Sequence, residues 1–291
     1  MRTAHSTFRV PHSALRLLQK HTIGLIGAGN MGQALLKGFV AAGLSPTRLA
    51  IVETQPTVQR LIRQRYGVLP ATLQKVARRC DVILLAVKPQ DLNEVLETLR
   101  HGVAGRKRQV LIISIAAGVT LHALERRLGR AAVVRAMPNL TAKVGLAISA
   151  VAAGRFATRT DQTIARAIFQ CVGEVVELPE RLFDIVTAIS GSGPAYFFLI
   201  FQALRDAGVK AGLSKAIAQR LAIQTALGSA QLVNDLHEPL ETLIARVASK
   251  KGTTEAALRV FRKRHLAEIL QAGVTAATRR SKELSWLLSK N

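Results

Sequence analysis

Residues 22–32 read Thr-Ile-Gly-Leu-Ile-Gly-Ala-Gly-Asn-Met-Gly, an apolar run that ends directly in the pattern Gly27-x-Gly29-x-x-Gly32. A strand that turns sharply into a helix needs Gly27 for the turn and Gly29 for close approach of a phosphate to the backbone. Gly32 then lets the helix pack on the strand. Residues 33–52 continue as an apolar helical pattern followed by a second strand. This unit predicts dinucleotide binding; the alternative is a glycine-rich turn without a ligand.

The rest of the chain falls into two parts. Its 291 residues and 49% hydrophobic content fit two domains with real cores. From 22 to 179, short apolar runs alternate with helical stretches, as in a mostly parallel sheet with right-handed crossovers. From 180 to 291 the apolar periodicity is helical. The predicted fold class is α/β, an N-terminal Rossmann-type dinucleotide-binding domain (22–179) followed by an all-α C-terminal dimerisation domain (180–291). Further strands are expected at 49–52, 82–87, 111–115, 133–135, 145–151 and 175–178.

The helical part is expected to need a partner. Residues 196–201 alone read Tyr-Phe-Phe-Leu-Ile-Phe, more apolar side chains than a small bundle readily buries. A second copy of the chain would cover them, so we predict a homo-oligomer.

The charge balance is strongly basic, with 41 Lys+Arg against 18 Asp+Glu and a formal net charge of +23. Basic residues form small scattered groups without interleaved aromatic side chains, which favours a solvated surface over a specific nucleic-acid interface. Such a surface would still concentrate anionic cofactors and substrates. Residues 1–21 contain no acidic residue, and we expect a poorly ordered basic extension there, with an organelle transit peptide as the alternative.

Cysteine and hydropathy patterns narrow the class further. The two cysteines, Cys80 and Cys171, lie in apolar surroundings without a Cys/His cluster at metal-ligand spacing, which predicts buried thiols, a reducing compartment and no metal. The longest apolar candidates, 82–87 and 110–119, fall well short of the roughly 18 uncharged residues that span a bilayer. We therefore expect no membrane insertion and a cytoplasmic location.

Ligands of an open parallel sheet bind at the carboxyl ends of its strands, so residues just after each strand are candidates. Glu53 follows the second strand about 20 residues after Gly32, the spacing at which a carboxylate holds the adenosine ribose. An acid there favours NADH, because the 2′-phosphate of NADPH would meet its negative charge. The alternative is that Arg60 or Arg63 accepts that phosphate.

Two later strand ends are further candidates. Lys88 follows the strand at 82–87 and could contact the cofactor or an anionic substrate; a solvated lysine is the alternative. Residues 115–118, Ile-Ala-Ala-Gly, include small residues that would let a nicotinamide ring lie against the backbone. The alternative is a loop without a ligand. Asn139 closes another strand with a polar side chain at its tip.

A hydroxyl-rich loop, 249–254, reads Ser-Lys-Lys-Gly-Thr-Thr and enters a helix. Backbone N–H groups and hydroxyls at such a helix start can bind a carboxylate. The glycine- and serine-rich run at 188–196 pairs with this loop as a second candidate region.

Several motifs, taken in this order, resemble the pyrroline-5-carboxylate reductase family. They are IGAGNM (26–31), AVKPQ (86–90), SIAAGVTL (114–121), VRAMPN (134–139), SGSGPAY (190–196), DAGVKAGL (206–213) and GTT (252–254). The resemblance covers 22 to 284. It implies NAD(P)H-dependent reduction of the cyclic imine 1-pyrroline-5-carboxylate to L-proline, the last step of proline biosynthesis, by a homodimer that often assembles into a decamer.

The resemblance also assigns residues. Those that would contact NADPH or NADH are Ile26, Gly27, Ala28, Gly29, Asn30, Met31, Ala86, Val87, Lys88, Pro89, Ile115, Ala116, Ala117 and Glu180. Those that would hold the substrate carboxylate and ring nitrogen are Ser249, Gly252, Thr253 and Thr254, with Thr254 as the catalytic hydroxyl at the nitrogen. Hydride attack on an imine needs positioning and a protonated nitrogen more than a strong base, so no triad is required.

The chain departs from the family pattern at two places. Family members usually read Ser-Pro-Gly-Gly-Thr-Thr in the substrate loop, where this chain has Lys250 and Lys251. If the lost glycine had a positive φ, Lys251 would strain the loop by roughly 1 kcal/mol; alternatively, the two lysines add attraction for a carboxylate. Leu140-Thr141 replaces the usual Thr-Pro after Asn139.

Two other functions remain compatible with the residues. The first is a related Rossmann reductase acting on another imine or a 3-hydroxy acid; a hydroxy-acid enzyme of this build would place a catalytic lysine in the helix after 193, where 194–199 offers none. The second is a catalytically weak NAD(P)-binding paralogue that uses its basic surface on polyanions.

Overall fold

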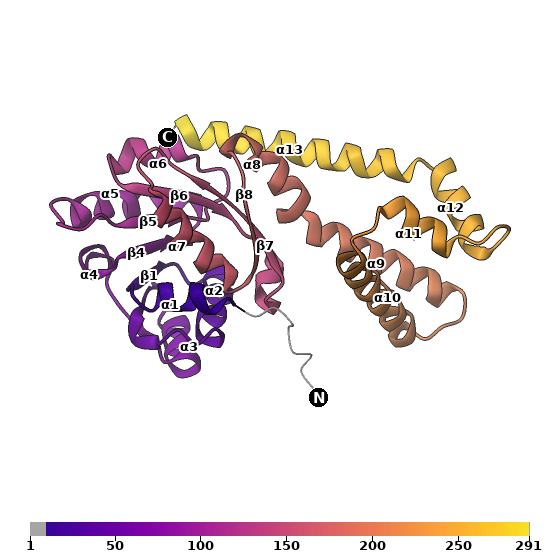
Figure 1. The fold of residues 1–291 in the computed structure, drawn as a ribbon, viewed down its shortest axis with the longest axis horizontal. Helices are drawn as coiled ribbons and strands as arrows, with labels where there is room; N and C mark the ends of the chain where they lie inside the picture. The colour runs from indigo at the N-terminus through magenta and orange to yellow at the C-terminus, as the bar shows by residue number, and fades with distance from the viewer. Residues whose placement is uncertain (1–9, 291) are drawn as a thin grey trace. The chain divides into compact units, whose positions relative to one another are not determined.

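The computed structural model describes residues 10–290 and the side chains of 10–288. It divides into two compact units (Figure 1): residues 10–191 together with residues 277–290, and Ser192–Ala276. The sequence boundary expected at 179/180 therefore lies before the point where the contacts change, and the end of the chain returns to the first unit. We describe each unit by itself.

The first unit is built on an eight-stranded sheet with the order β3-β2-β1-β4-β5-β6-β7-β8. The strands are β1 (Ile23–Ile26), β2 (Leu49–Val52), β3 (Leu69–Pro70), β4 (Val82–Leu85), β5 (Leu111–Ser114), β6 (Ala132–Met137), β7 (Ala147–Ala153) and β8 (Gly173–Glu177). Its helices are α1 (His12–Leu18), α2 (Asn30–Ala41), α3 (Pro56–Tyr66), α4 (Leu73–Arg79), α5 (Leu92–Val103), α6 (Leu121–Leu128), α7 (Arg159–Gln170) and α8 (Phe183–Val186).

Helices cover both faces of this sheet (Figure 1). Every residue of β1, β4 and β5 is buried, which explains why these strands are continuous apolar runs rather than alternating ones. One apolar core joins the sheet to α1, α2 and α7, and a second joins it to α4, α5 and α6. The chain crosses from β1 to β2 on one side and to β4 on the other, so the crevice expected for a ligand lies at the carboxyl ends of β1 and β4.

The sheet matches the predicted parallel pattern except at β7. Strands β6 and β7 pair antiparallel, with Met137 opposite Ala150, while β7 and β8 are again parallel. The short strand β3 was missed, because two exposed residues carry no periodic pattern. The predicted mostly parallel sheet with α/β alternation is therefore confirmed, and the direction of one strand is a new finding.

The basic N-terminal extension is partly ordered. Residues 12–18 form α1, which packs on α7, and its Ala14 and Leu18 are 6% and 0% exposed. The expected poor order of 1–21 is thus wrong for this segment, because apolar residues at helical spacing anchor it to the core. Residues 1–9 lie outside the described part.

The second unit contains α9 (Gly193–Lys210), α10 (Lys215–Leu236), α11 (Leu240–Val247), α12 (Thr253–Lys263) and the start of α13 (Leu266–Lys290). Helices α9 and α10 pack on each other. Between Ser192 and Ala276, all of which is described, the only buried side chains are Ala218 and Ala222. Phe197, Phe198 and Leu199 are 56 to 67% exposed. A unit with so little core cannot fold stably by itself, and its apolar surface needs a partner.

The helical stretch Glu180–Lys210 is longer and more apolar than expected from the sequence. Glu180–Lys210 is, by length and composition alone, able to cross a membrane, and it is the one such helix in the described residues. The prediction that 82–87 and 110–119 are the longest apolar runs is wrong, because α8, a π-helix at Thr187–Gly191 and α9 join into nearly continuous helix. Only 17% of its most apolar window is buried.

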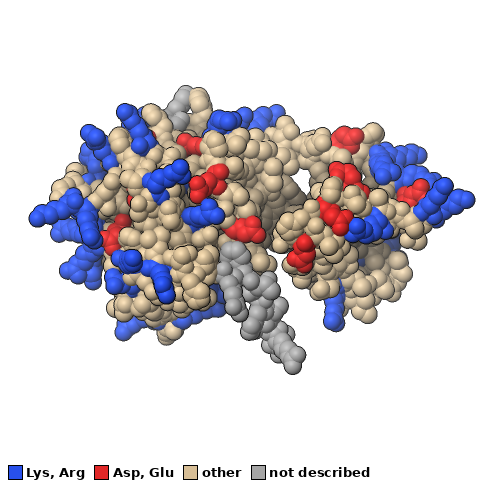
Figure 2. Space-filling model, viewed as in Figure 1, with Lys and Arg blue, Asp and Glu red and all other residues tan. Residues whose placement is uncertain are grey.

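Part of the positive charge lies at the carboxyl ends of helices. Helices α3, α4, α5 and α6 each end with two basic residues in their last turn. Cations at the carboxyl ends of helices interact favourably with the helix dipole, so these side chains stabilise the helices that carry them. Figure 2 shows Lys and Arg in separate groups over the visible face, with Asp and Glu among them. The solvated basic surface expected from the sequence stays a prediction.

Candidate active site

The three glycines of the β1–α2 turn have different surroundings. Gly27 has φ +96°, and a Cβ there would lie 2.7 Å from the carbonyl oxygen of Ala86. A Cβ on Gly32 would lie 2.3 Å from the carbonyl oxygen of Gly27. Nothing lies within 4 Å of the corresponding position on Gly29. The turn and the helix packing thus need Gly27 and Gly32, while the space over Gly29 is left open to a ligand.

Helix α2 begins directly at this open space. Its N-cap is Gly29, which offers no side-chain hydrogen bond to the first turn, so the N–H groups there remain available. The twelve-residue helix adds the positive end of its dipole. This arrangement fits the diphosphate of a dinucleotide.

Glu53 is fastened to the same turn. One carboxylate oxygen accepts from the N–H of Ala28 at 3.0 Å, and the other accepts from the N–H of Gln55 at 2.9 Å. The Gln59 amide nitrogen donates to the Glu53 carbonyl at 2.5 Å. The carboxylate therefore stands at the carboxyl end of β2 beside the glycine-rich turn, where the sequence spacing predicts contact with the ribose.

Two further loops extend the same edge. The Ala86 N–H donates to the Ile26 carbonyl at 2.8 Å, and the Ile115 N–H donates to the Leu85 carbonyl at 3.1 Å. Because β1, β4 and β5 are neighbours in parallel, residues 86–89 and 115–117 lie next to each other along the crevice. Lys88 is exposed there, and Ala117 presents a small exposed surface. The structure thus brings these predicted cofactor residues of the first unit to one edge.

Glu180 takes part in a half-buried ion pair. Its Oε1 lies 2.8 Å from a guanidinium nitrogen of Arg135, whose side chain is 5% exposed. The same oxygen accepts from the N–H of Leu121 at 2.7 Å, at the start of α6. The guanidinium also lies over the ring of Phe183, 4.9 Å from its centroid. Glu180 therefore fixes α6, just after the loop 115–117, and its expected contact with the cofactor stays a prediction.

The hydroxyl-rich loop lies in the second unit between α11 and α12. The Gly252 N–H donates to the Ser249 carbonyl at 2.9 Å, and Gly252 is the N-cap of α12 without a side-chain cap. Thr253 and Thr254 are the first two residues of the helix. Lys251 has φ +62°, and its N–H donates to a Glu255 carboxylate oxygen at 2.5 Å. The condition for a strained loop, a positive φ at the position of Lys251, is therefore met.

Comparisons with known proteins cover both units. A family model described as pyrroline-5-carboxylate reductase dimerisation matches residues 180–284, and one described as NADP oxidoreductase coenzyme F420-dependent matches residues 22–118. The chain is 41% identical over 264 residues to a pyrroline-5-carboxylate reductase of Synechocystis, covering 90% of this chain and 97% of that one. It is 37% identical over 265 residues to the Arabidopsis thaliana protein of the same name, covering 90% and 95%.

Solved structures agree. The fold is similar to a pyrroline-5-carboxylate reductase from Coxiella burnetii, with a TM-score of 0.86, 34% identity and coverage of 91% of this chain and 98% of that one. It is also similar to pyrroline carboxylate reductase of Plasmodium falciparum with NADP bound, with a TM-score of 0.81, 30% identity and coverage of 92% and 99%.

The chain belongs to the pyrroline-5-carboxylate reductase family.

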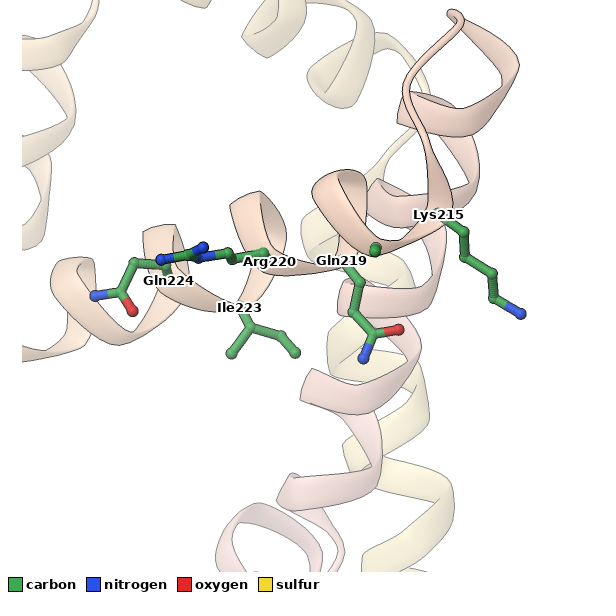
Figure 3. Close-up of a pocket in the computed structure, with 6 residues that line it drawn as sticks. Lys215, Gln219, Arg220, Ile223 and Gln224 are labelled. Atoms are coloured by element: carbon green, nitrogen blue, oxygen red, sulfur yellow. The ribbon is translucent and has the colours of Figure 1, made fainter. Parts of the chain in front are cut away.

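Membership in the reductase family explains the exposed apolar helices. The dimerisation model spans the unit that buries almost nothing within one chain, and it includes the apolar stretch Glu180–Lys210. An open pocket of about 630 Å³ on α10 lies in the same region, lined by Lys215, Gln219, Arg220, Ile223 and Gln224 (Figure 3). None of the predicted site residues lines it.

The reductase chain also accommodates its unusual Leu140-Thr141. The Thr141 hydroxyl is 2.7 Å from the Asn139 Oδ1 and 2.7 Å from the Leu146 carbonyl. The Asn139 side chain, 8% exposed, donates to the Ser190 carbonyl at 3.2 Å. The Thr141 hydroxyl therefore ties the loop by hydrogen bonds to Asn139 and Leu146. Asn139, named only as a polar strand tip in the sequence, joins the β6 loop to the glycine- and serine-rich turn.

The cysteines and metal candidates complete the site description. Cys80 and Cys171 are buried free thiols. Among the described residues, no group of three or more His, Cys, Asp or Glu side chains is placed to hold a metal ion.

Proposed function

We propose that this chain reduces 1-pyrroline-5-carboxylate to L-proline with NADPH or NADH, the last step of proline biosynthesis. Relatives that match 90% of the chain carry the name of this enzyme. The dinucleotide-binding unit and the helical unit expected for such an enzyme are both present here. The observation that carries the proposal is the uncapped, hydroxyl-rich start of α12 in a chain that also has an open glycine turn at α2.

The cofactor would lie across the carboxyl ends of β2, β1, β4 and β5. The open space at Gly29 and the free N–H groups of α2 fit its diphosphate. Residues 115–117 would support the nicotinamide, and Glu53 would hold the adenosine ribose. When bound, the cofactor supplies a hydride. The charge of Glu53 beside the ribose favours NADH over NADPH, although a relative has NADP bound.

The substrate would be held by the loop at 249–254. Its carboxylate fits the N–H groups at the start of α12 together with the hydroxyls of Ser249 and Thr253. The Thr254 hydroxyl would hydrogen-bond the ring nitrogen. The imine carbon gains the hydride, the C=N double bond becomes a single bond, and the nitrogen keeps the proton of the protonated imine. Positioning of this kind is worth several kcal/mol, about 7 to 11 in well-oriented systems.

Steady-state oxidation of NADH and NADPH with 1-pyrroline-5-carboxylate tests the proposal. We expect turnover by the full chain, and a fall in kcat of roughly 10- to 100-fold in Thr254→Val. The matched control is Thr242→Val, an exposed threonine of α11. Absence of turnover with either cofactor across a broad pH range would overturn the proposal, whereas turnover of a different imine would reassign the substrate.

We also propose that the active form is a homodimer, assembled further into a decamer, that works in the cytoplasm. The exposed apolar side chains of α9 and α10 support self-association. Light scattering on the purified protein distinguishes two chains from ten, and a monomer would contradict both. Cell fractionation tests the compartment.

A further inference from the structure

Lys143 extends along α2 from a distant part of the chain. It belongs to a short 3₁₀ helix, Leu140–Val144, that follows β6. Its ammonium donates to the Asn30 Oδ1 at 2.9 Å, and its own carbonyl accepts from the Lys37 ammonium at 2.9 Å. Asn30 is the first residue of α2 and Lys37 lies two turns further along. The Lys143 side chain therefore points toward the amino end of α2.

This end of α2 is the edge where the glycine turn lies. Strand β6 runs parallel to β5, so the segment after β6 leaves the sheet at its carboxyl edge, as the β1–α2 turn does. The Lys143 ammonium is thus next to the residue that immediately follows Gly29, over which the structure is open.

The charges in this place are not neutralised by the protein. None of the ion pairs among the described residues includes Lys143 or Lys37. The Lys143 ammonium has three N–H donors, and one of them binds the neutral amide oxygen of Asn30. The positive end of the α2 dipole adds to the same field. This arrangement suits an anion with two neighbouring negative charges, such as a diphosphate.

We propose that Lys143 is a further cofactor-positioning residue, whose ammonium binds the diphosphate of NADH and NADPH at the amino end of α2. Asn30 holds the ammonium in place, and Lys37 holds the backbone of Lys143. The inference rests on the proposed function, because it assumes that a dinucleotide occupies this turn. It concerns the diphosphate that both cofactors share, and is independent of the contact between Glu53 and the ribose.

Binding measurements on the full chain test the inference without turnover. Dissociation constants for NADH, NADPH and ADP-ribose are measured by calorimetry for the wild type, Lys143→Gln and Lys143→Arg, at low and at high salt. We expect Lys143→Gln to weaken all three ligands by a similar factor of roughly three to ten, and to reduce the salt dependence of binding. Lys143→Arg keeps the charge and recovers most of the affinity.

The matched control is Lys75→Gln, which removes an exposed lysine from α4. It should leave all three dissociation constants and the salt dependence unchanged. Equal binding of ADP-ribose by Lys143→Gln and the wild type would overturn the inference, and a lowered melting temperature in that case would assign the bond from Lys143 to Asn30 a structural role. If the wild type binds none of the three ligands, the proposed function fails with it.

Discussion

The carboxylate of Glu53 accepts a hydrogen bond of 3.0 Å from the backbone N–H of Ala28, which joins the carboxyl end of β2 to the glycine-rich turn. The charge is thereby held at a fixed place beside the predicted ribose site. A side chain that is free to turn away would discriminate poorly between the two cofactors. This bond gives the sequence-based expectation of NADH preference a geometric basis.

Glu53→Gln should raise the catalytic efficiency with NADPH relative to NADH by roughly tenfold. The amide oxygen can still accept from Ala28, while the negative charge that would repel a 2′-phosphate is gone. The ratio of the two kcat/KM values is the measurement. Glu97→Gln, an exposed change on α5, serves as the control. An unchanged ratio in Glu53→Gln would remove Glu53 from cofactor discrimination.

Lys251→Gly should stabilise the protein by about 1 kcal/mol. Lys251 has φ +62°, a conformation that glycine adopts without steric cost. Thermal unfolding at a fixed protein concentration measures the effect, since assembly contributes to stability. Lys250→Gly is the matched control, because Lys250 is not among the positive-φ residues and should lose up to about 1 kcal/mol. Equal effects of the two variants would show that φ at 251 is not strained.

Gly252→Ala should lower kcat/KM for the imine by at least about tenfold and leave cofactor affinity unchanged. The added Cβ would lie 2.3 Å from the Ser249 Oγ and 3.0 Å from the Ser249 carbonyl oxygen, so the substrate loop must shift. Cofactor binding resides in the first unit and is measured separately.

A double variant distinguishes this clash from other effects. Ser249→Ala removes the closest clashing atom, so Gly252→Ala in that background should cost less activity than in the wild type. If the two losses simply add, the steric account of Gly252 is wrong.

The buried cysteines should make stability fall at high pH. Burial, with the neighbouring Asp81, raises the pKa of Cys80 from 9.0 to about 11, and burial raises the pKa of Cys171 to about 12. A thiol whose pKa is higher in the folded than in the unfolded protein contributes stability that is fully present below about pH 9. This stability is lost as the pH rises from about 9 to the folded pKa, about 11 for Cys80 and about 12 for Cys171, because the unfolded thiols ionise first. Each thiol accounts for about 1.4 kcal/mol per pH unit in that window.

Chemical unfolding from pH 8 to 11 measures this loss. The double variant Cys80→Ala/Cys171→Ala should show a flatter pH profile than the wild type, since other groups titrate equally in both. The folded wild type should also resist alkylation at pH 8. Rapid alkylation of either thiol without unfolding would contradict the burial on which this prediction depends.

Features that depend on residues close together in the chain could be predicted from the sequence. Local spacing and apolar patterns predict the turn at Gly27 and Gly29, the buried strands β1, β4 and β5, and helix α6 at Leu121–Leu128. The left-handed backbone at Lys251 was one of two alternatives that the sequence left open for the substrate loop.

Contacts between distant residues could not be predicted in this way. The bonds from Lys143 to Asn30, from Glu53 to Ala28 and from Arg135 to Glu180 join segments that are 25 to 113 residues apart. The docking of α1 on α7 and the antiparallel direction of β7 are of the same kind. These contacts form because the strand order and the packing of helices on the sheet bring distant segments together, and burial of apolar side chains, which depends on the whole fold, drives that packing.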